Sequence, residues 1–362
     1  MGIHKIVLAV AMLVLVALLP ARAVAERPAG YPRSYDALIG RAQAEGGAVV
    51  FGNADSAHVR PVIAAFRQRY PGIAIHYHDL QSNEIYRRVV ARSRAGQPSA
   101  DLVWSSSMPL QAKLVNDRYA QAYASPEKPH LPPYAVWKNE AWGITAEPVV
   151  VAYNRRLLAA ADVPTTHRRL EALLTRRRAA LTGKVGTYDP AIAEVGYQFL
   201  REDFAATQDT RALLQAMAAT RPRFFPGTDP MLDAISTGEL AIGYNLVGSY
   251  ALQRAARDPA IGVVLLTDYT LVTQRIALIT REARHPASAK LFLDFLLSPA
   301  GQRALAAQHF PPIRTDVRAL RTPPGQARTL QVGPQLLVHL DRLTRQRMLA
   351  DWRAIFAQGR EQ

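Results

Sequence analysis

The sequence predicts an α/β protein of two lobes. The chain has 362 residues, which is more than one hydrophobic core usually organises. Short apolar runs alternate along it with segments of helical periodicity, the pattern of α/β proteins. Hydrophobic residues make up 49% of the chain, so a sizeable core can form although there is no cysteine to crosslink it.

The first 25 residues have the pattern of a secretory signal peptide. His4 and Lys5 precede an apolar run of 14 residues, 6–19, and Ala23 and Ala25 form a small-residue cleavage site. The run is shorter than the roughly 20 residues that a membrane-spanning helix needs, although an uncleaved anchor is the alternative. We expect cleavage after Ala25. No cysteine follows to accept a lipid, so we expect a free periplasmic protein and not a lipoprotein.

The chain is strongly basic, with a formal net charge of +15 that falls to +13 when Lys5 and Arg22 leave with the signal peptide. Of the 44 cationic residues, 38 are arginine, which favours paired contacts with carboxylate and phosphate groups. A GC-rich genome that encodes arginine in place of lysine explains the same bias. The cationic residues are scattered along the chain, so no nucleic-acid partner is expected.

The elements of lobe one come first in the chain. The apolar run 48–51 reads as a strand that enters a turn, and a helix with apolar residues over 59–66 follows it. The next elements repeat this alternation: strands over 73–78, 100–104 and 149–154, helices over 84–95 and after Ser107, and a surface loop over 120–140.

The elements of lobe two continue the alternation. Helical patterns are expected over 165–182, up to about 219, over 229–237 and over 248–257, with strands at 184–188, 240–244 and 262–266. A strand at 276–280 then returns to helices at 286–297 and 299–308, and the tail is helical over 334–357. We therefore assign 26–153 and 267–362 to lobe one and 154–266 to lobe two, with a hinge near 152–154 and 266–272.

Small polar residues follow several of the predicted strands, where helices begin. In open α/β sheets ligands bind beyond the carboxyl ends of strands, and helix N-termini suit anions. These junctions, with the tyrosine at the first crossing, supply the candidate ligand-binding residues: Asn53, Asp55, Ser56, Ala57, Ser105, Ser106, Ser107, Tyr153, Tyr188, Asp189, Tyr244, Asn245 and Ser249.

Each candidate has a structural alternative. Serine and aspartate at these positions commonly cap helices, and a serine can cap and bind at once. Asp55 and Asp189 would suit the hydroxyl or ammonium groups of a mixed-charge ligand if they do not cap. His76 and His78 alternate on one strand face without a third metal ligand nearby, so neither a metal nor a cofactor is expected.

The same segments resemble the type II periplasmic solute-binding proteins of ABC importers. The resemblance covers roughly residues 46–312 and is carried by the order and spacing of six motifs, at 50–53, 61–66, 99–105, 151–154, 238–245 and 286–301. The branch that these motifs resemble binds ferric ions, phosphonates, sugar phosphates and phosphoglycerate. The resemblance implies two α/β lobes, each a mixed sheet flanked by helices, joined by crossing strands. It also implies a monomer that closes the lobes over a solute and docks on an inner-membrane permease, without catalysis.

The sequence favours one class among the ligands that this branch binds. Ferric-ion binders characteristically use two adjacent tyrosines, whereas here Tyr244 and Tyr250 are six residues apart. The serine-rich junctions favour a small anion of the organophosphate or phosphonate type. Ferric binding, ligand presentation to a sensor kinase and a secreted hydrolase remain as alternatives, and the hydrolase lacks a recognisable catalytic motif.

Overall fold

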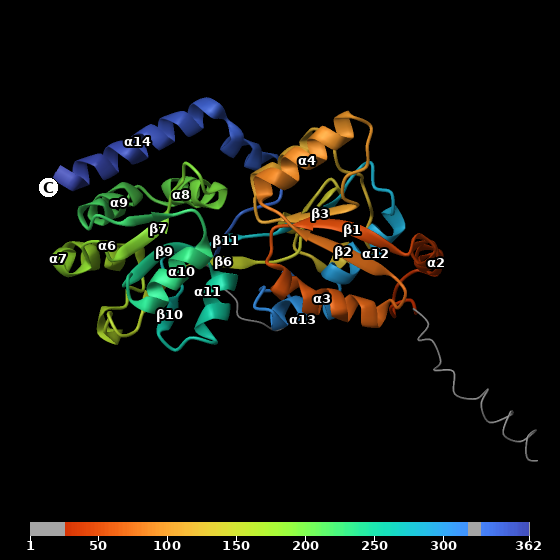
Figure 1. Ribbon diagram of the computed structural model, residues 1–362, viewed down its shortest axis with the longest axis horizontal. Coiled ribbons are helices and arrows are strands. Elements are labelled where there is room, and N and C mark those ends of the chain that lie inside the picture. Colours follow the sequence, from red (N-terminus) through yellow and green to blue (C-terminus); the bar gives the residue numbers. More distant parts are fainter. Residues whose placement is uncertain (1–25, 318–326, 362) are drawn as a thin grey trace, which may run out of the picture.

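The computed structural model describes residues 26–317 and 327–361, and the predicted signal peptide lies outside this part of the chain. Two mixed sheets, each flanked by helices, form two lobes that lie side by side (Figure 1). This confirms the predicted fold class. None of the helices in the described residues is long and apolar enough to cross a membrane.

Lobe one is built on a six-stranded sheet with strand order β2-β1-β3-β12-β5-β4. Its strands are β1 (Gly47–Gly52), β2 (Ala74–Asp79), β3 (Leu102–Ser105), β4 (Val136–Trp137), β5 (Ala141–Gly143) and β12 (Ile276–Ile279). Strand β1 pairs in parallel with β2 and β3, whereas β12 returns antiparallel to β3. The carboxyl ends of β1 and β3 therefore meet at one edge, beside the start of β12.

The helices of lobe one cover both faces of this sheet. They are α2 (Tyr35–Glu45), α3 (Ser56–Arg69), α4 (Ser82–Arg94), α5 (Met108–Asn116), α12 (Pro286–Leu297) and α13 (Pro299–Ala307). Helix α3 buries Val59, Val62 and Phe66 on one face, and Phe66 packs edge-on against Phe292 of α12. The apolar spacing that predicted α3 is therefore the spacing of its core contacts.

Lobe two is built on a seven-stranded sheet with the order β13-β11-β6-β9-β7-β8, and β10 pairs with β6 beside this path. Its strands are β6 (Glu147–Asn154), β7 (Val185–Tyr188), β8 (Arg223–Phe225), β9 (Ile242–Val247), β10 (Ile261–Val264), β11 (Thr270–Thr273) and β13 (Ala327–Thr329). Its helices are α6 (His167–Arg176), α7 (Arg178–Leu181), α8 (Glu194–Ala206), α9 (Thr210–Ala219), α10 (Thr228–Thr237), α11 (Gly248–Ala255) and α14 (Arg342–Glu361).

The chain crosses between the sheets at other residues than the sequence predicted. Strand β6 lies wholly in the second sheet, so the first crossing is at 144–146 and not near 153. Strand β11 also lies in the second sheet, so the return is at 274–275 and not near 267. The prediction placed the first boundary at the end of β6 and the second in the loop between β10 and β11, both within lobe two. An apolar strand carries no mark of the sheet that it joins.

The C-terminal residues 327–361, here called the strap, connect the lobes a third time. Strand β13 pairs with β11 in lobe two, and the Val332 amide donates to the Tyr134 carbonyl of lobe one (2.8 Å). The short helix η4 (Pro334–Leu340) contacts α5 of lobe one, and α14 packs on α9 of lobe two (Figure 1). Helix α14 buries Trp352 and Phe356 against Phe224, so the assignment of the whole tail to lobe one is wrong.

Candidate functional site

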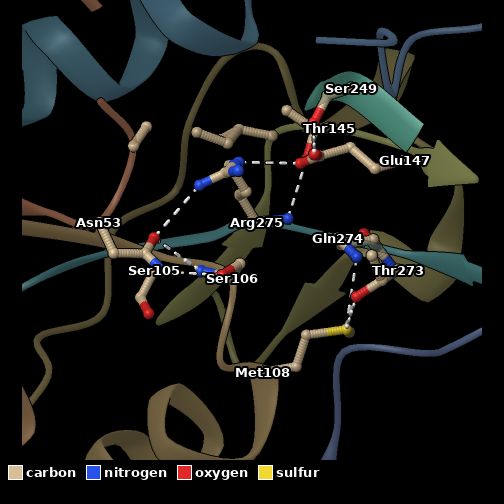
Figure 2. A network of polar contacts seen from close by, with 12 residues as sticks. Asn53, Ser105, Ser106, Met108, Thr145, Glu147, Ser249, Thr273, Gln274 and Arg275 are labelled. Atoms are coloured by element: carbon tan, nitrogen blue, oxygen red, sulfur yellow. Dashed lines mark hydrogen bonds and ion pairs between the residues drawn. The ribbon is translucent and has the colours of Figure 1, made fainter. Parts of the chain in front are cut away.

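Arg275 lies where the chain returns from lobe two to lobe one, between β11 and β12. Its side chain is 1% exposed, and its guanidinium Nε lies 2.9 Å from Glu147 Oε1. Glu147 begins β6, directly after the other crossing, and is also 1% exposed. The two crossings therefore each contribute one member of a buried ion pair (Figure 2).

Both members of the ion pair have further hydrogen-bond partners. The Thr145 hydroxyl donates to Glu147 Oε1 (2.9 Å) and accepts from the Arg275 amide (2.8 Å). The Ser249 hydroxyl of α11 donates to Glu147 Oε2. Burial alone would lower the pKa of Arg275, but the charge of Glu147 and the Tyr250 hydroxyl raise it, so the guanidinium stays charged.

Lobe one presents the Asn53 amide to the same guanidinium, and serine hydroxyls contact that amide. Arg275 Nη1 donates to Asn53 Oδ1 (3.2 Å), at the carboxyl end of β1. The Asn53 amide nitrogen donates to the hydroxyls of Ser82 (2.9 Å) and Ser106 (2.7 Å), and the Ser82 hydroxyl lies 3.0 Å from that of Ser105. Asn53 and Ser106, which follow β1 and β3, are thus joined by a hydrogen bond (Figure 2).

Aromatic rings enclose the guanidinium. Its carbon lies 5.5 Å from the ring centroid of Tyr250 in lobe two and 5.0 Å from that of Phe310 in lobe one. His58 of α3 meets Tyr250 edge-on, with ring centroids 6.2 Å apart. We call this set the interlobe junction: Asn53, Ser82, Ser105, Ser106, Thr145, Glu147, Ser249, Tyr250 and Arg275.

Two glycines let the elements of the junction approach one another. A Cβ on Gly248 would lie 2.4 Å from the Pro148 carbonyl oxygen, so only glycine lets α11 begin against β6 and bring Ser249 to Glu147. A Cβ on Gly52 would lie 2.4 Å from the Tyr77 hydroxyl oxygen. That hydroxyl bonds both the amide (3.0 Å) and the carbonyl (2.6 Å) of Ala54, and so fixes the turn that carries Asn53.

The start of α3 lies beside the junction. Its backbone amides donate hydrogen bonds to carboxylate side chains. Asp55 is the N-cap, and its side chain accepts from the Ala57 amide (2.6 Å). The Ser56 amide donates to Asp79 Oδ2 at the end of β2 (3.2 Å). The capping alternative for Asp55 is thus realised, and the amide groups of Ser56 and Ala57 already have carboxylate partners.

Tyr244 and Asn245 point away from the junction into lobe two. The Tyr244 hydroxyl (2.9 Å) and the Asn245 amide (2.6 Å) both donate to Oδ2 of Asp203 in α8, and Tyr269 donates to Oδ1 (2.9 Å). Burial raises the pKa of Asp203, while the His167 charge and these hydrogen bonds lower it. We call Asp203, Tyr244, Asn245 and Tyr269 the Asp203 cluster.

The four remaining candidates make local contacts. Tyr188 is buried and its hydroxyl pairs with that of Thr228, while Asp189 accepts from the Ala191 amide (2.9 Å) in a local turn. Tyr153 packs on Gly262 of β10, away from the junction. The Ser107 amide donates to the Ser105 hydroxyl (3.2 Å), and the buried Ser107 hydroxyl has no partner.

Five residues of the junction were not predicted from the sequence: Arg275, Glu147, Thr145, Ser82 and Tyr250. The signal for the first two was present, because each is a single charge within a long apolar stretch, and a buried charge requires a partner. Ser82 and Tyr250 carry no such mark. In the described residues no group of three or more His, Cys, Asp or Glu side chains could hold a metal ion, and His76 and His78 lie on the outer strand β2.

Comparison with known proteins identifies the family. Residues 49–311 match the family described as bacterial extracellular solute-binding protein. No curated protein matches. Among solved structures, the substrate-binding protein of an ABC transporter from Agrobacterium tumefaciens is 33% identical with a TM-score of 0.80, over 86% of this chain and 94% of that chain.

More distant structures share the fold. Iron-bound HitA from Pseudomonas aeruginosa is 18% identical with a TM-score of 0.66, over 85% of this chain and 99% of that chain. AfuA from Actinobacillus pleuropneumoniae, with fructose-6-phosphate bound, is 18% identical with a TM-score of 0.66, over 86% and 99%. The resemblance inferred from the sequence is confirmed: the chain belongs to the bacterial extracellular solute-binding proteins and is a binding protein, not an enzyme.

Proposed function

We propose that the chain captures a small anionic solute of the organophosphate or phosphonate type between its lobes and delivers it to an inner-membrane ABC permease. One observation carries the anionic part: a charged guanidinium stands at the crossing of the lobes, with hydrogen-bonding groups from both lobes directed toward it. A planar guanidinium matches the oxygens of phosphate and phosphonate groups.

Access to Arg275 requires the lobes to separate. The side chain is 1% exposed, and the contact between His58 and Tyr250 closes the lobes in front of it. In the open form the oxyanion would meet Arg275 together with the hydroxyls of Ser82 and Ser106. Closure would add Ser249 and Tyr250 from lobe two, so the ligand shifts the population toward the closed form.

Glu147 fixes the orientation of the guanidinium and neutralises its positive charge in part. It accepts from Arg275 Nε and therefore leaves the two terminal nitrogens of the fork for Asn53 and for a ligand. It also offsets one positive charge, so the junction suits an anion that brings hydroxyl or amide partners as well as charge. Sugar phosphates and hydroxylated phosphonates meet both requirements.

A ferric ligand is less well supported. Ferric-ion binding by tyrosine needs hydroxyls that are free to ionise. Here the Tyr244 hydroxyl donates to Asp203, and burial raises the pKa of Tyr250 beside Arg275. AfuA, which has the same fold, is a precedent for a phosphate ester, and HitA for iron. The predicted periplasmic location and monomeric state are part of the same proposal.

Isothermal titration calorimetry against a panel of phosphate esters and phosphonates tests the proposal, with ferric citrate as a further arm. We expect at least one member to bind, and Arg275→Gln to weaken that binding by about 100-fold or more, since it removes a charge-assisted contact. Arg281→Gln, at an exposed pair with Glu282, is the matched control and should bind like wild type. No binding of any phosphorus compound at millimolar concentration would overturn the proposal.

A further inference from the structure

A second pocket lies between the strap and α8, away from the interlobe junction. It has a volume of about 670 Å³, within the range of small-molecule sites. One wall comes from α8 of lobe two, and the other comes from β13, η4 and the start of α14. We call it the strap pocket and define it by Arg201, Glu202, Phe204, Arg328, Leu336 and His339.

A buried imidazole in this pocket has an unused nitrogen. His339 is 3% exposed, and its Nε2 lies 3.1 Å from Glu202 Oε1. Its Nδ1 has no hydrogen-bond partner. A buried polar atom without a partner costs roughly 1–3 kcal/mol. With Nε2 donating to Glu202, Nδ1 of a neutral imidazole is an acceptor, so a ligand group that donates to Nδ1 would recover this cost.

Two guanidinium groups stand at the same pocket. Arg201 comes from α8, and Arg328, whose Nη2 donates to the Ala205 carbonyl (3.0 Å), comes from β13. Glu202 is the one carboxylate among the described residues that line the pocket, so the charge of the lining is about +1 without the imidazole. The lining therefore suits a single negative charge.

The remaining wall is apolar. Phe204 of α8 faces Leu330 and Leu336 of the strap, and Met348 of α14 completes this side. Leu330 and Leu336 are 5% and 2% exposed, so they belong to the core and present a fixed surface. An apolar ligand body against these side chains would add burial, at roughly 25 cal/mol per Å².

We propose that the strap pocket binds an amphipathic organic monoanion, with its carboxylate between Arg201 and Arg328 and its apolar body along Phe204, Leu336 and Met348. Such a ligand would join α8 to the strap. The strap is bonded to the crossing, because the Leu330 amide donates to the Val272 carbonyl (2.9 Å) and the Gln274 side chain donates to the Leu330 carbonyl (2.6 Å). The site is independent of the ligand between the lobes.

Octanoate is the probe, with butanoate and octylammonium as controls for chain length and charge. By calorimetry we expect octanoate to bind at high micromolar to millimolar concentration and the other two at least about 10-fold more weakly. Arg201→Gln and Arg328→Gln should each weaken octanoate binding about 10-fold. Arg211→Gln, an exposed arginine of α9 outside the pocket, should change nothing.

The location is checked by amide hydrogen exchange and by Arg275→Gln. Octanoate should slow exchange in α8 and over 330–339, and Arg275→Gln should leave octanoate binding intact even if phosphate esters no longer bind. Any one of three results would overturn the proposal. The first is no octanoate binding at about 10 mM, and the second is equally tight binding of octylammonium. The third is that Arg275→Gln abolishes octanoate binding while Arg201→Gln has no effect.

Discussion

The interlobe junction and the Asp203 cluster are both buried polar networks, but the first joins the two lobes and the second lies within lobe two. The junction runs from Asn53 in lobe one through Arg275 and Glu147 to Ser249 in lobe two. The Asp203 cluster joins α8 to β9 and to Tyr269 within lobe two alone. A movement of the lobes changes the surroundings of the first network and leaves the second intact.

The two networks also differ in how their charge is balanced. Glu147 is paired with a full positive charge at 2.9 Å, whereas Asp203 receives hydrogen bonds from two hydroxyls and an amide, and its pKa is raised by burial. A buried ion pair is costly to form, so a pair held at the crossing of the lobes is a candidate for a functional charge. The difference supports the proposal that the junction recognises the ligand, whereas the contacts of the cluster stay within lobe two.

Removal of Arg275 should have the largest effect on stability. Arg275→Met leaves Glu147 buried without its partner, which costs about 3–5 kcal/mol in the free energy of unfolding. Urea denaturation followed by circular dichroism measures this. The double variant Arg275→Met with Glu147→Gln should recover part of the loss. A change below about 1 kcal/mol for Arg275→Met would show that the pair is not held as described.

A third buried carboxylate, that of Asp294, should make the free energy of unfolding depend on pH. Burial raises the pKa of Asp294 to about 7, although hydroxyls of Ser125, Tyr123 and Tyr35 bond it. The folded state therefore keeps a proton that the unfolded state releases near pH 4, so this contribution is complete below pH 4 and is lost as the pH rises to 7. We expect a loss of up to about 1.4 kcal/mol per pH unit from this group.

Asp294→Asn is the control for that dependence. The amide does not titrate, so the difference in unfolding free energy between wild type and variant should change with pH between 4 and 7 and stay constant above. Chemical denaturation at a series of pH values measures the difference. A difference that is independent of pH would contradict the assignment.

Asp203→Asn tests whether the Asp203 cluster is only structural. The amide cannot accept all of the donors from Tyr244, Asn245 and Tyr269, so we expect a loss of about 1–3 kcal/mol in stability. Affinity for the ligand of the junction should stay within twofold of wild type. A large loss of affinity without a loss of stability would place Tyr244 and Asn245 in the binding site after all.

The smallest effect is expected for Asp55→Ala at the start of α3. Loss of the cap should cost about 1 kcal/mol, measured by thermal denaturation. Asp55→Ser supplies another capping side chain and should restore most of this stability. If Asp55 also contacts the ligand, the serine variant will recover stability while its affinity remains reduced.

The sequence predicted most long helices and central strands, but not α2, β4, β5, β8, β11 or β13, and it predicted few of the contacts between elements. Apolar periodicity located α3, β6 and α12, because each buries the face that its pattern marks. It did not show that Asn53 and Asn245, which both follow apolar strand residues, point to different networks. Asn245 adopts φ 64° within β9, beside an irregular register with β6, and this directs its side chain toward Asp203. Such a local irregularity has no signature in hydropathy.

Arg275 shows a second reason why the site could not be predicted from the sequence. Its charge is visible in the sequence, but its partners come from positions 53, 145 and 147 and become neighbours only when the two crossings lie side by side. Long-range pairing of this kind depends on the topology of both sheets. Strand β11, which delivers Arg275 to its place, was itself not predicted.

The guanidinium resonance of Arg275 offers the most direct test of the central claim. In protein labelled with ¹⁵N-arginine, the Nε signal that disappears in Arg275→Lys reports on this side chain alone. When the phosphate ester or phosphonate that binds best is titrated, this signal should shift and saturate together with the calorimetric binding curve. Saturation of binding with an unmoved Arg275 signal would show that the ligand is held elsewhere.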